Sequence, residues 1–100
     1  MKLKSNKVNP KDLTPQTLLA MIIADPIYKK YGREFVATSL NDSVHRDGSK
    51  HYTGNGVDGR TYYFTEDQKK QVVAELKTQL GLYYDIILES DHIHIEYDPK

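Results

Sequence analysis

Residues 65–97 read TEDQKKQVVAELKTQLGLYYDIILESDHIHIEY, and this stretch decides the fold because a capped helix and two strands follow one another in it. Its first four residues, Thr65–Gln68, form a capping box, in which side chains bond to free backbone N–H groups at a helix start. The apolar stripe that follows at helical spacing consists of Val72, Val73, Leu76 and Leu80. The stripe ends at Gly81, a residue type common at helix ends, so we predict an amphipathic helix over residues 66–80.

Two β-prone runs follow this helix. Residues 83–88 and 92–97 are rich in Tyr and Ile, which favour strands. Only Glu89, Ser90 and Asp91 separate the two runs. Such a short polar connection predicts a hairpin of two antiparallel strands.

The N-terminal half of the chain predicts another helix. Thr14 is a suitable cap for a helix that has Pro15 in its first position. The apolar residues that we expect to form the buried stripe of this helix are Leu18, Leu19, Ile22 and Ile23. Pro26 disfavours helical geometry in the residue before it, so we expect a break there and a short turn over residues 27–31 that closes at Gly32.

A β-prone segment over residues 34–39 precedes a long stretch with many glycines. Four of the six glycines lie between Leu40 and Arg60, so we expect a loop. Loops longer than about 12 to 15 residues are uncommon in compact domains and are usually functional or disordered. This one is rich in His, Asp and Ser, side chains that carry chemistry.

The order of helix, strand, loop, helix and hairpin predicts the fold class. We expect one α+β domain over residues 1–100, with a small, mainly antiparallel sheet and two or three helices packed on it. Leu, Ile, Val and Phe make up 24% of the chain, above the roughly 20% below which highly charged chains stay disordered. A folded domain with a modest core is therefore expected.

Composition argues against several classes of function. Lys and Arg total 14 and so do Asp and Glu, so the chain lacks the basic excess that drives binding to nucleic acid, and we expect no such partner. The absence of Cys excludes disulfides and thiol catalysis. The longest apolar run, Leu18–Ala24, has seven residues, whereas a membrane span needs about 20. No apolar segment follows the basic start, so we expect no signal peptide and no membrane insertion.

The histidines, at positions 45, 51, 92 and 94, each have an Asp within a few residues. His92 and His94 are expected on one face of the last strand, because side chains alternate along a strand. A catalytic zinc ion takes three protein ligands from His and carboxylate and keeps one position open for water. His51, Asp58 and His94 provide such a set. The same residues also have explanations without a metal. His51 could be a loop residue bonded to a nearby carboxylate, and the histidines of the last strand could simply face solvent.

The order of these residues resembles a known family. Residues 49–58, SKHYTGNGVD, are similar to the pattern Ser-x-His-x-x-Gly-x-Ala-x-Asp, and the His-x-His strand lies downstream. From Thr38 to Lys100 the chain resembles the zinc peptidase family that contains bacterial D-alanyl-D-alanine carboxypeptidases, phage L-alanyl-D-glutamate endolysins and the hedgehog signalling domain. The resemblance implies a hedgehog/DD-peptidase-like fold.

The resemblance also implies roles for individual residues. It assigns His51, Asp58 and His94 as zinc ligands. Asp91, three positions before the last of these ligands, is implied to be the general base of the reaction. Glu89 is a second candidate for the same role. Both acids also suit a hairpin connection that has no function.

The same resemblance implies three further roles, and the sequence differs from the family pattern at two positions. His92 is implied to stabilise the oxyanion or the attacking water, Ser49 to support the loop or the substrate, and Arg46 to hold a substrate carboxylate. Gly56 stands where the family has Ala, and Gly59 stands where an apolar residue is usual. The strand that presents the Asp ligand is therefore expected to be more flexible than in the family.

The resemblance thus implies a zinc-dependent peptidase that hydrolyses an amide bond in peptidoglycan stem peptides, of the endolysin or the DD- or LD-peptidase type. Zn²⁺ is the expected cofactor and a monomer the expected state. Such a protein would be made in the bacterial cytoplasm and act on the cell wall after release or as part of a phage particle. The alternatives are a non-catalytic domain of the same fold that uses zinc for structure or partner binding, and a small fold with no metal.

Overall fold

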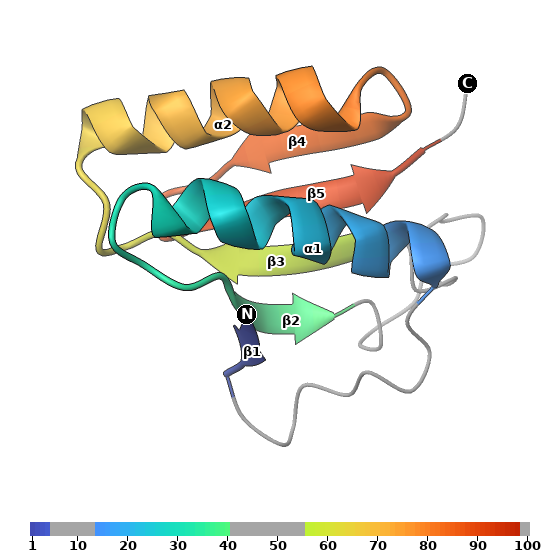
Figure 1. Cartoon of the computed structure of the whole chain (residues 1–100), viewed down its shortest axis with the longest axis horizontal. Helices are drawn as coiled ribbons and strands as arrows, with labels where there is room; N and C mark the ends of the chain where they lie inside the picture. Colours follow the sequence, from blue (N-terminus) through green and yellow to red (C-terminus); the bar gives the residue numbers. More distant parts are fainter. Residues whose placement is uncertain (5–13, 41–55, 99–100) are drawn as a thin grey trace.

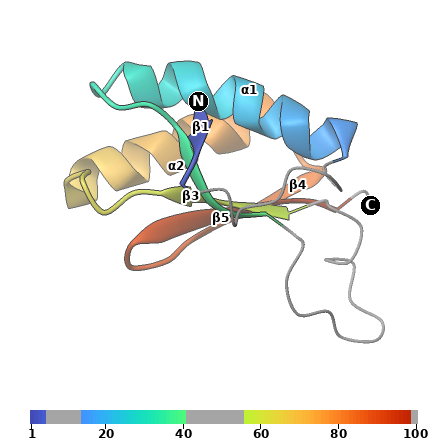
Figure 2. The same ribbon diagram turned by 90° about the horizontal axis from the view of Figure 1, so that it is seen from below.

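A five-stranded sheet carries both helices on one of its faces (Figure 1, Figure 2). The computed structural model describes residues 1–4, 14–40 and 56–98. The elements of this part are β1 (Lys2–Leu3), α1 (Pro15–Lys29), β2 (Val36–Leu40), β3 (Gly56–Arg60), α2 (Glu66–Leu80), β4 (Tyr84–Leu88) and β5 (His92–Tyr97). The predicted α+β class is confirmed.

The strands lie in the order β1-β2-β3-β5-β4. β1 runs parallel to β2, and the pairs β2–β3, β3–β5 and β4–β5 are antiparallel, so the sheet is mixed but mainly antiparallel. β4 and β5 form the predicted hairpin. The expected loop from Leu40 to Arg60 is wrong at its C-terminal end, where residues 56–60 form β3 and pair with strands on both sides. Residues 41–55 lie outside the described part of the chain.

Helix α2 begins and ends where the sequence predicts. The Thr65 hydroxyl accepts from the Gln68 backbone N–H at 3.1 Å, and the Gln68 side chain accepts from the Thr65 N–H at 3.0 Å, which completes the capping box. Val72, Leu76 and Leu80 are buried. Neither of the two described helices is long and apolar enough to cross a membrane.

Helix α1 begins at its predicted cap, where the Thr14 hydroxyl accepts from the Thr17 N–H at 3.3 Å. The predicted buried stripe is wrong at Leu18, Leu19 and Ile22, which are 41%, 49% and 50% exposed, whereas its fourth member, Ile23, is partly buried against the core. The buried residues of the helix are Thr17, Ala20, Met21, Ala24, Ile27 and Tyr28. Ala20 and Ala24 let the helix backbone lie close to its neighbours, and Met21, Ile27 and Tyr28 supply the large side chains of the buried face.

The break predicted at Pro26 is also wrong. Pro26 lies inside α1, which continues to Lys29, and Gly32 follows with a φ of 79°. A proline cannot bond to the carbonyl four residues earlier, which here is that of Ile22 on the exposed side of the helix. Water can hydrate that carbonyl, so the helix tolerates the missing bond.

The core lies between the helices and the sheet. Val57 of β3 and Ile93 and Ile95 of β5 point toward the helices and are 0% or 1% exposed. An aromatic cluster fills the rest, with the ring centroid of Tyr28 5.0 Å from that of Phe35 and 4.9 Å from that of Phe64. Edge-to-face packing of this kind stabilises a core beyond the area that it buries.

Gly59 is the point at which the aromatic cluster meets β3. A Cβ added there would overlap the ring carbons of Phe35 and lie 3.2 Å from the Tyr28 hydroxyl. Gly59 also lies within a strand that pairs on both edges. The departure from the family pattern at this position therefore has a packing reason, because only glycine leaves room for the Phe35 ring.

Candidate functional site

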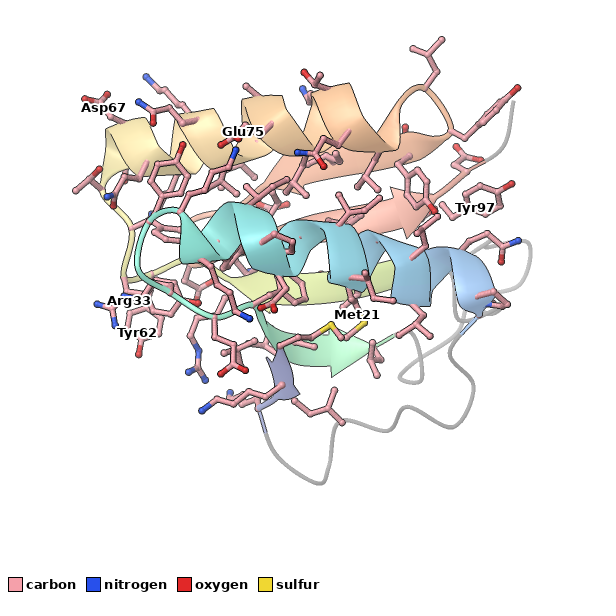
Figure 3. The ribbon with its side chains drawn as sticks, in the orientation of Figure 1. Met21, Arg33, Tyr62, Asp67, Glu75 and Tyr97 are labelled. Atoms are coloured by element: carbon pink, nitrogen blue, oxygen red, sulfur yellow. The ribbon has the colours of Figure 1, made fainter. Side chains whose placement is uncertain are left out.

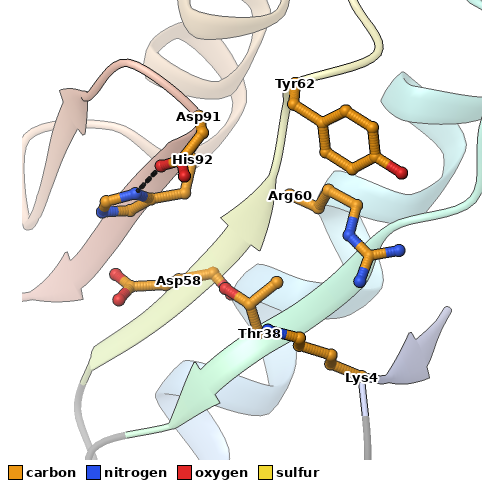
Figure 4. Close-up of a pocket in the computed structure, with 7 residues that line it drawn as sticks. All are labelled: Lys4, Thr38, Asp58, Arg60, Tyr62, Asp91 and His92. Carbon is orange, nitrogen blue, oxygen red and sulfur yellow. Dashed lines mark hydrogen bonds and ion pairs between the residues drawn. The ribbon is translucent and has the colours of Figure 1, made fainter.

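Polar side chains lie on the face of the sheet opposite the helices, and seven of them are drawn in Figure 4. In the register of β3 with β5, Asp58 lies opposite His94 and Arg60 opposite His92. Alternation along each strand puts the intervening apolar residues on the helix side. The prediction that His92 and His94 share a face is confirmed, because both are partly exposed while their neighbour Ile93 is buried.

Asp58 and His94 form the closest contact on this face. Oδ1 of Asp58 lies 2.7 Å from Nδ1 of His94, and the two side chains are 26% and 24% exposed. The second ring nitrogen, Nε2, lies 3.0 Å from Oε1 of Glu96, which is itself buried. The hydrogen bond with Asp58, assisted by that with Glu96 and opposed by burial, raises the pKa of His94 to about 9. Without a metal, the ring is therefore protonated at neutral pH and bridges two carboxylates.

Asp91 and His92 form a second pair at the end of the hairpin. Oδ1 of Asp91 lies 2.8 Å from Nδ1 of His92, and the Asp91 side chain is 73% exposed. This hydrogen bond lowers the pKa of Asp91, and the positive charge of Lys4 contributes in the same direction. The Thr61 backbone N–H donates to the Asp91 carbonyl at 3.1 Å, which ties the hairpin connection to the end of β3. Asp91 is therefore an ionised, accessible carboxylate on a fixed backbone.

A pocket of about 330 Å³ brings Asp58 together with Asp91 and His92, whereas His94 and Glu96 do not line it (Figure 4). Its lining residues are Lys4, Thr38, Asp58, Arg60, Tyr62, Asp91 and His92. The two candidates for the general base therefore differ in position. Asp91 lines the pocket together with Asp58, whereas Glu89 does not line it. Glu89 instead closes the hairpin, where its backbone N–H donates to the His92 carbonyl at 2.8 Å.

Sequence reasoning missed Lys4, Thr38 and Arg60 as parts of the pocket. The sequence contained a signal for Arg60, because this residue lies two positions after Asp58 and would share its face in a strand. Lys4 had none, because the parallel pairing of β1 with β2 brings it there from the start of the chain. The remaining predicted site residues, Arg46, Ser49 and His51, lie outside the described residues.

Asp58 and His94 are spaced closely enough to be two ligands of one zinc ion. Two N or O ligands of one tetrahedral zinc ion lie about 3.3 Å apart, given metal–ligand distances of about 2.0 to 2.2 Å. The observed 2.7 Å therefore needs to widen by about half an ångström, which side-chain rotation supplies. A zinc-ligating His usually donates its other ring N–H to a carboxylate, and Glu96 holds that position here. The donor atoms fit two of the three ligand positions.

A third ligand does not come from the described residues, among which no group of three or more His, Cys, Asp or Glu side chains converges on one point. The family resemblance assigns that third position to His51. Comparisons of the chain with protein-family models, with curated proteins and with solved structures find no match. The site is therefore interpreted from its own geometry.

Proposed function

We propose that this protein is a zinc-dependent peptidase that hydrolyses an amide bond in the stem peptides of bacterial peptidoglycan. The observation that carries the proposal is the 2.7 Å contact between Asp58 and His94 on the face of the sheet opposite the helices, beside a pocket that also holds Asp91 and His92. The substrate class comes from the family resemblance, and the ligand chemistry from the donor atoms. Such an enzyme acts on the cell wall after release or as part of a phage particle.

His51, Asp58 and His94 hold the metal in this proposal. A bound zinc ion supplies a Lewis acid that polarises the amide carbonyl and makes water more acidic. Glu96 accepts from Nε2 of His94 and so keeps Nδ1 of the ring available as a metal ligand. Asp58 would supply a carboxylate oxygen as the second ligand.

Asp91 is the general base. Its carboxylate is ionised and exposed, so it takes a proton from the attacking water and passes it to the leaving amine. His92 is bonded to Asp91 through Nδ1, and its Nε2 has no hydrogen-bond partner among the described residues. In its doubly protonated form the ring donates from Nδ1 to Asp91 and from Nε2 to the oxyanion that develops on the substrate carbonyl.

The test measures zinc content and the hydrolysis of purified peptidoglycan fragments before and after chelation. We expect Asp58→Ala and His94→Ala to lose both zinc and activity. Asp91→Asn keeps zinc and lowers kcat by about 10² to 10⁴, whereas Glu89→Gln stays within about twofold of the unsubstituted protein. Asp67→Asn, on the exposed first turn of α2, is the control for the loss of a carboxylate elsewhere.

Three outcomes contradict the proposal. Full metal-dependent activity in Asp58→Ala means that the ligands are wrongly assigned. A zinc-loaded protein that cleaves no wall fragment supports the non-catalytic alternative. A protein that binds no zinc at neutral pH leaves Asp58, His94 and Glu96 as an ion-paired network of the sheet.

A further inference from the structure

The sheet ends in two edges of different kinds. β1 is two residues long and is followed by Lys4, and short length and lysine both discourage pairing with another chain. β4 has five residues, Tyr84–Leu88, and contains no Lys, Pro or Gly. Among the described strands it pairs with β5 alone, at the edge that lies beside α2 in Figure 1. The β4 edge therefore lacks the usual protection against pairing with a further strand.

The hydrogen bonds of the hairpin determine which backbone groups of β4 point outward. The Glu89 N–H donates to the His92 carbonyl at 2.8 Å. Bonded and non-bonded pairs alternate along antiparallel strands, so the odd-numbered residues of β4 bond to β5 and the even-numbered residues bond outward. The N–H and C=O of Ile86 and the N–H of Leu88 therefore point away from the sheet. No backbone group in the described part of the chain pairs with them.

A groove of about 560 Å³ lies along this edge. Its apolar lining comes from Leu82, Tyr84, Ile86 and Ile87, of which Leu82 and Ile87 are 87% and 51% exposed. Outward N–H and C=O groups beside exposed apolar side chains suit an extended peptide, which pairs through its backbone and covers the apolar surface with its side chains. The groove shares no lining residue with the pocket of Asp58, so a ligand here does not depend on the proposed peptidase.

The two sides of the groove differ in charge. Glu75 of α2 faces α1, where it is bonded to Lys30 (Figure 3). Lys77, two positions further, points to the other side of the helix and lines the groove as an exposed cation. Asp85 and Ile87 line the groove from the opposite face of β4. An acidic side chain is therefore attracted on the helix side and repelled on the other side, where an apolar side chain fits against Ile87.

We propose that β4 binds an extended segment of a protein partner as an additional antiparallel strand, whose acidic side chains face Lys77 and whose apolar side chains face Ile87. A second copy of this chain matches the edge less well. Two β4 strands joined in antiparallel fashion keep their helices on one face, so the Lys77 ammonium groups of the two copies would repel each other. In a register centred on Ile86, the Asp85 carboxylates would also be diagonal neighbours of like charge.

The experiment titrates the full chain with the synthetic peptide acetyl-Thr-Val-Glu-Val-Glu-Val-Thr-amide, in which acidic and apolar residues alternate. Calorimetry at low salt measures the affinity. We expect a Kd of about 10 to 500 μM, as for a short strand that must be ordered on binding. No binding at about 1 mM peptide would overturn the proposal.

N-methyl groups test whether the backbone of the peptide makes the contact. In the antiparallel arrangement, the peptide residues bonded to Ile86 and Leu88 have their side chains on the helix side, so they are the Glu residues. N-methylation of both Glu residues should weaken binding by at least about 10-fold. N-methylation of two Val residues is the control and should cost less than about threefold. Equal losses, or a larger loss from the Val residues, would contradict the proposed pairing.

A reversal of charge tests the role of Lys77. We expect Lys77→Glu to weaken binding of the Glu peptide by about 3- to 10-fold and to strengthen binding of the same peptide with Lys in place of Glu. Lys2→Glu is the matched control, because Lys2 is exposed on β1 at the other edge of the sheet. Melting curves confirm that both variants are folded. Equal changes in the two variants would mean that Lys77 does not select the partner.

Amide hydrogen exchange locates the bound peptide on the sheet. The N–H groups of Ile86 and Leu88 should exchange more slowly when the peptide is bound, and those of β1 should not change. Protection that spares β4 would overturn the proposal. Sedimentation of the chain alone gives the remaining check, because a dimer that the peptide dissociates would mean that a second copy, and not another protein, occupies this edge.

Discussion

Gly59 shows how a single residue couples the core to the candidate site. It follows Asp58 in β3, and the Phe35 ring occupies the space in which its side chain would lie. The same position looked like a source of flexibility in the sequence, because glycine gives no hint of what packs against it. The contact joins residues 24 positions apart, so no local pattern could have predicted it.

We expect Gly59→Ala to lower the free energy of unfolding by about 1 to 3 kcal/mol, because the added methyl group forces the Phe35 ring to move. Urea denaturation measures the change. In a Phe35→Leu background the same substitution should cost less, since the ring is gone. Equal costs in the two backgrounds would show that another neighbour causes the strain.

The Tyr28 hydroxyl is a second buried group with a measurable cost. It is buried without a hydrogen-bond partner in the described part of the chain, and burial raises the pKa of Tyr28 far above its usual range. We expect Tyr28→Phe to raise the free energy of unfolding by about 1 kcal/mol, because the unpaired hydroxyl no longer has to be desolvated.

Tyr31→Phe is the matched control for this substitution. The Tyr31 hydroxyl lies 3.0 Å from both Gln71 Oε1 and Glu75 Oε2, so its removal should lower stability. Thermal melts of the two variants are compared under one condition. A loss of stability in Tyr28→Phe as large as that in Tyr31→Phe would mean that the Tyr28 hydroxyl has a partner after all.

At the scale of elements, the sequence predicted the parts whose signals are local. Helix α2 has its cap, stripe and terminal glycine within residues 65–81, and the hairpin has its connection between its two strands. β3 has no such signal, because two of its five residues are glycines and its pairing partners supply its stability. The predicted buried face of α1 was wrong for a related reason, since which face of a helix is buried depends on what packs against it.

Lys69 links α2 to the hairpin. Its ammonium donates to the Ser90 carbonyl at 3.0 Å and lies 3.3 Å from Oε1 of Glu66, and the residue is only 7% exposed. We expect Lys69→Met to lower the free energy of unfolding by about 1 to 2 kcal/mol, because a charged hydrogen bond to the hairpin is lost.

Lys70→Met is the control, because Lys70 is the exposed neighbour of Lys69 in the same helix. Its effect should stay within about 0.5 kcal/mol. Hydrogen exchange of the amides in residues 84–97 gives an independent measurement, and it should speed up in Lys69→Met alone. Equal exchange in both variants would show that the lysine does not fasten the hairpin.

At the scale of the molecule, the free energy of unfolding depends on the protonation of His94, because strand pairing places this ring next to Asp58. Hydrogen bonding to Asp58 raises the pKa of this imidazole to about 9 from an ordinary value of 6.5. Protonation therefore stabilises the metal-free fold fully below pH 6.5, and this contribution is lost as the pH rises through 9. We expect the free energy of unfolding of the chelated protein to fall by roughly 2 to 3 kcal/mol over that range.

The measurement is urea denaturation at a series of pH values. His94→Gln should remove most of the decline, since no ring is left to titrate. Added zinc should reverse the trend, because a metal ligand must lose its proton and zinc affinity rises with pH. An unchanged decline in the presence of zinc would contradict the proposed ligand role of His94.

The fold class was predictable because local signals along the chain give the order of its helices and strands. Of the site, only the placement of neighbouring residues on one strand was predictable. His92 and His94 share a face through simple alternation. The contact between Asp58 and His94 bridges 36 positions and needs the β3–β5 register, which the sequence does not state. The cations Lys4 and Arg60 meet only after β1 joins the sheet.

The two faces of β3 and β5 have a consequence for how such a protein can evolve. Neighbouring positions on one strand belong either to the interior or to the polar surface, so mutations can change the polar surface without repacking the interior. The same alternation makes an error in strand pairing costly, because a slip of one position would turn Ile93 and Ile95 to water and the histidines inward. Correct pairing of β3 with β5 therefore also brings Asp58 next to His94, and descendants can replace these polar side chains while they inherit the scaffold.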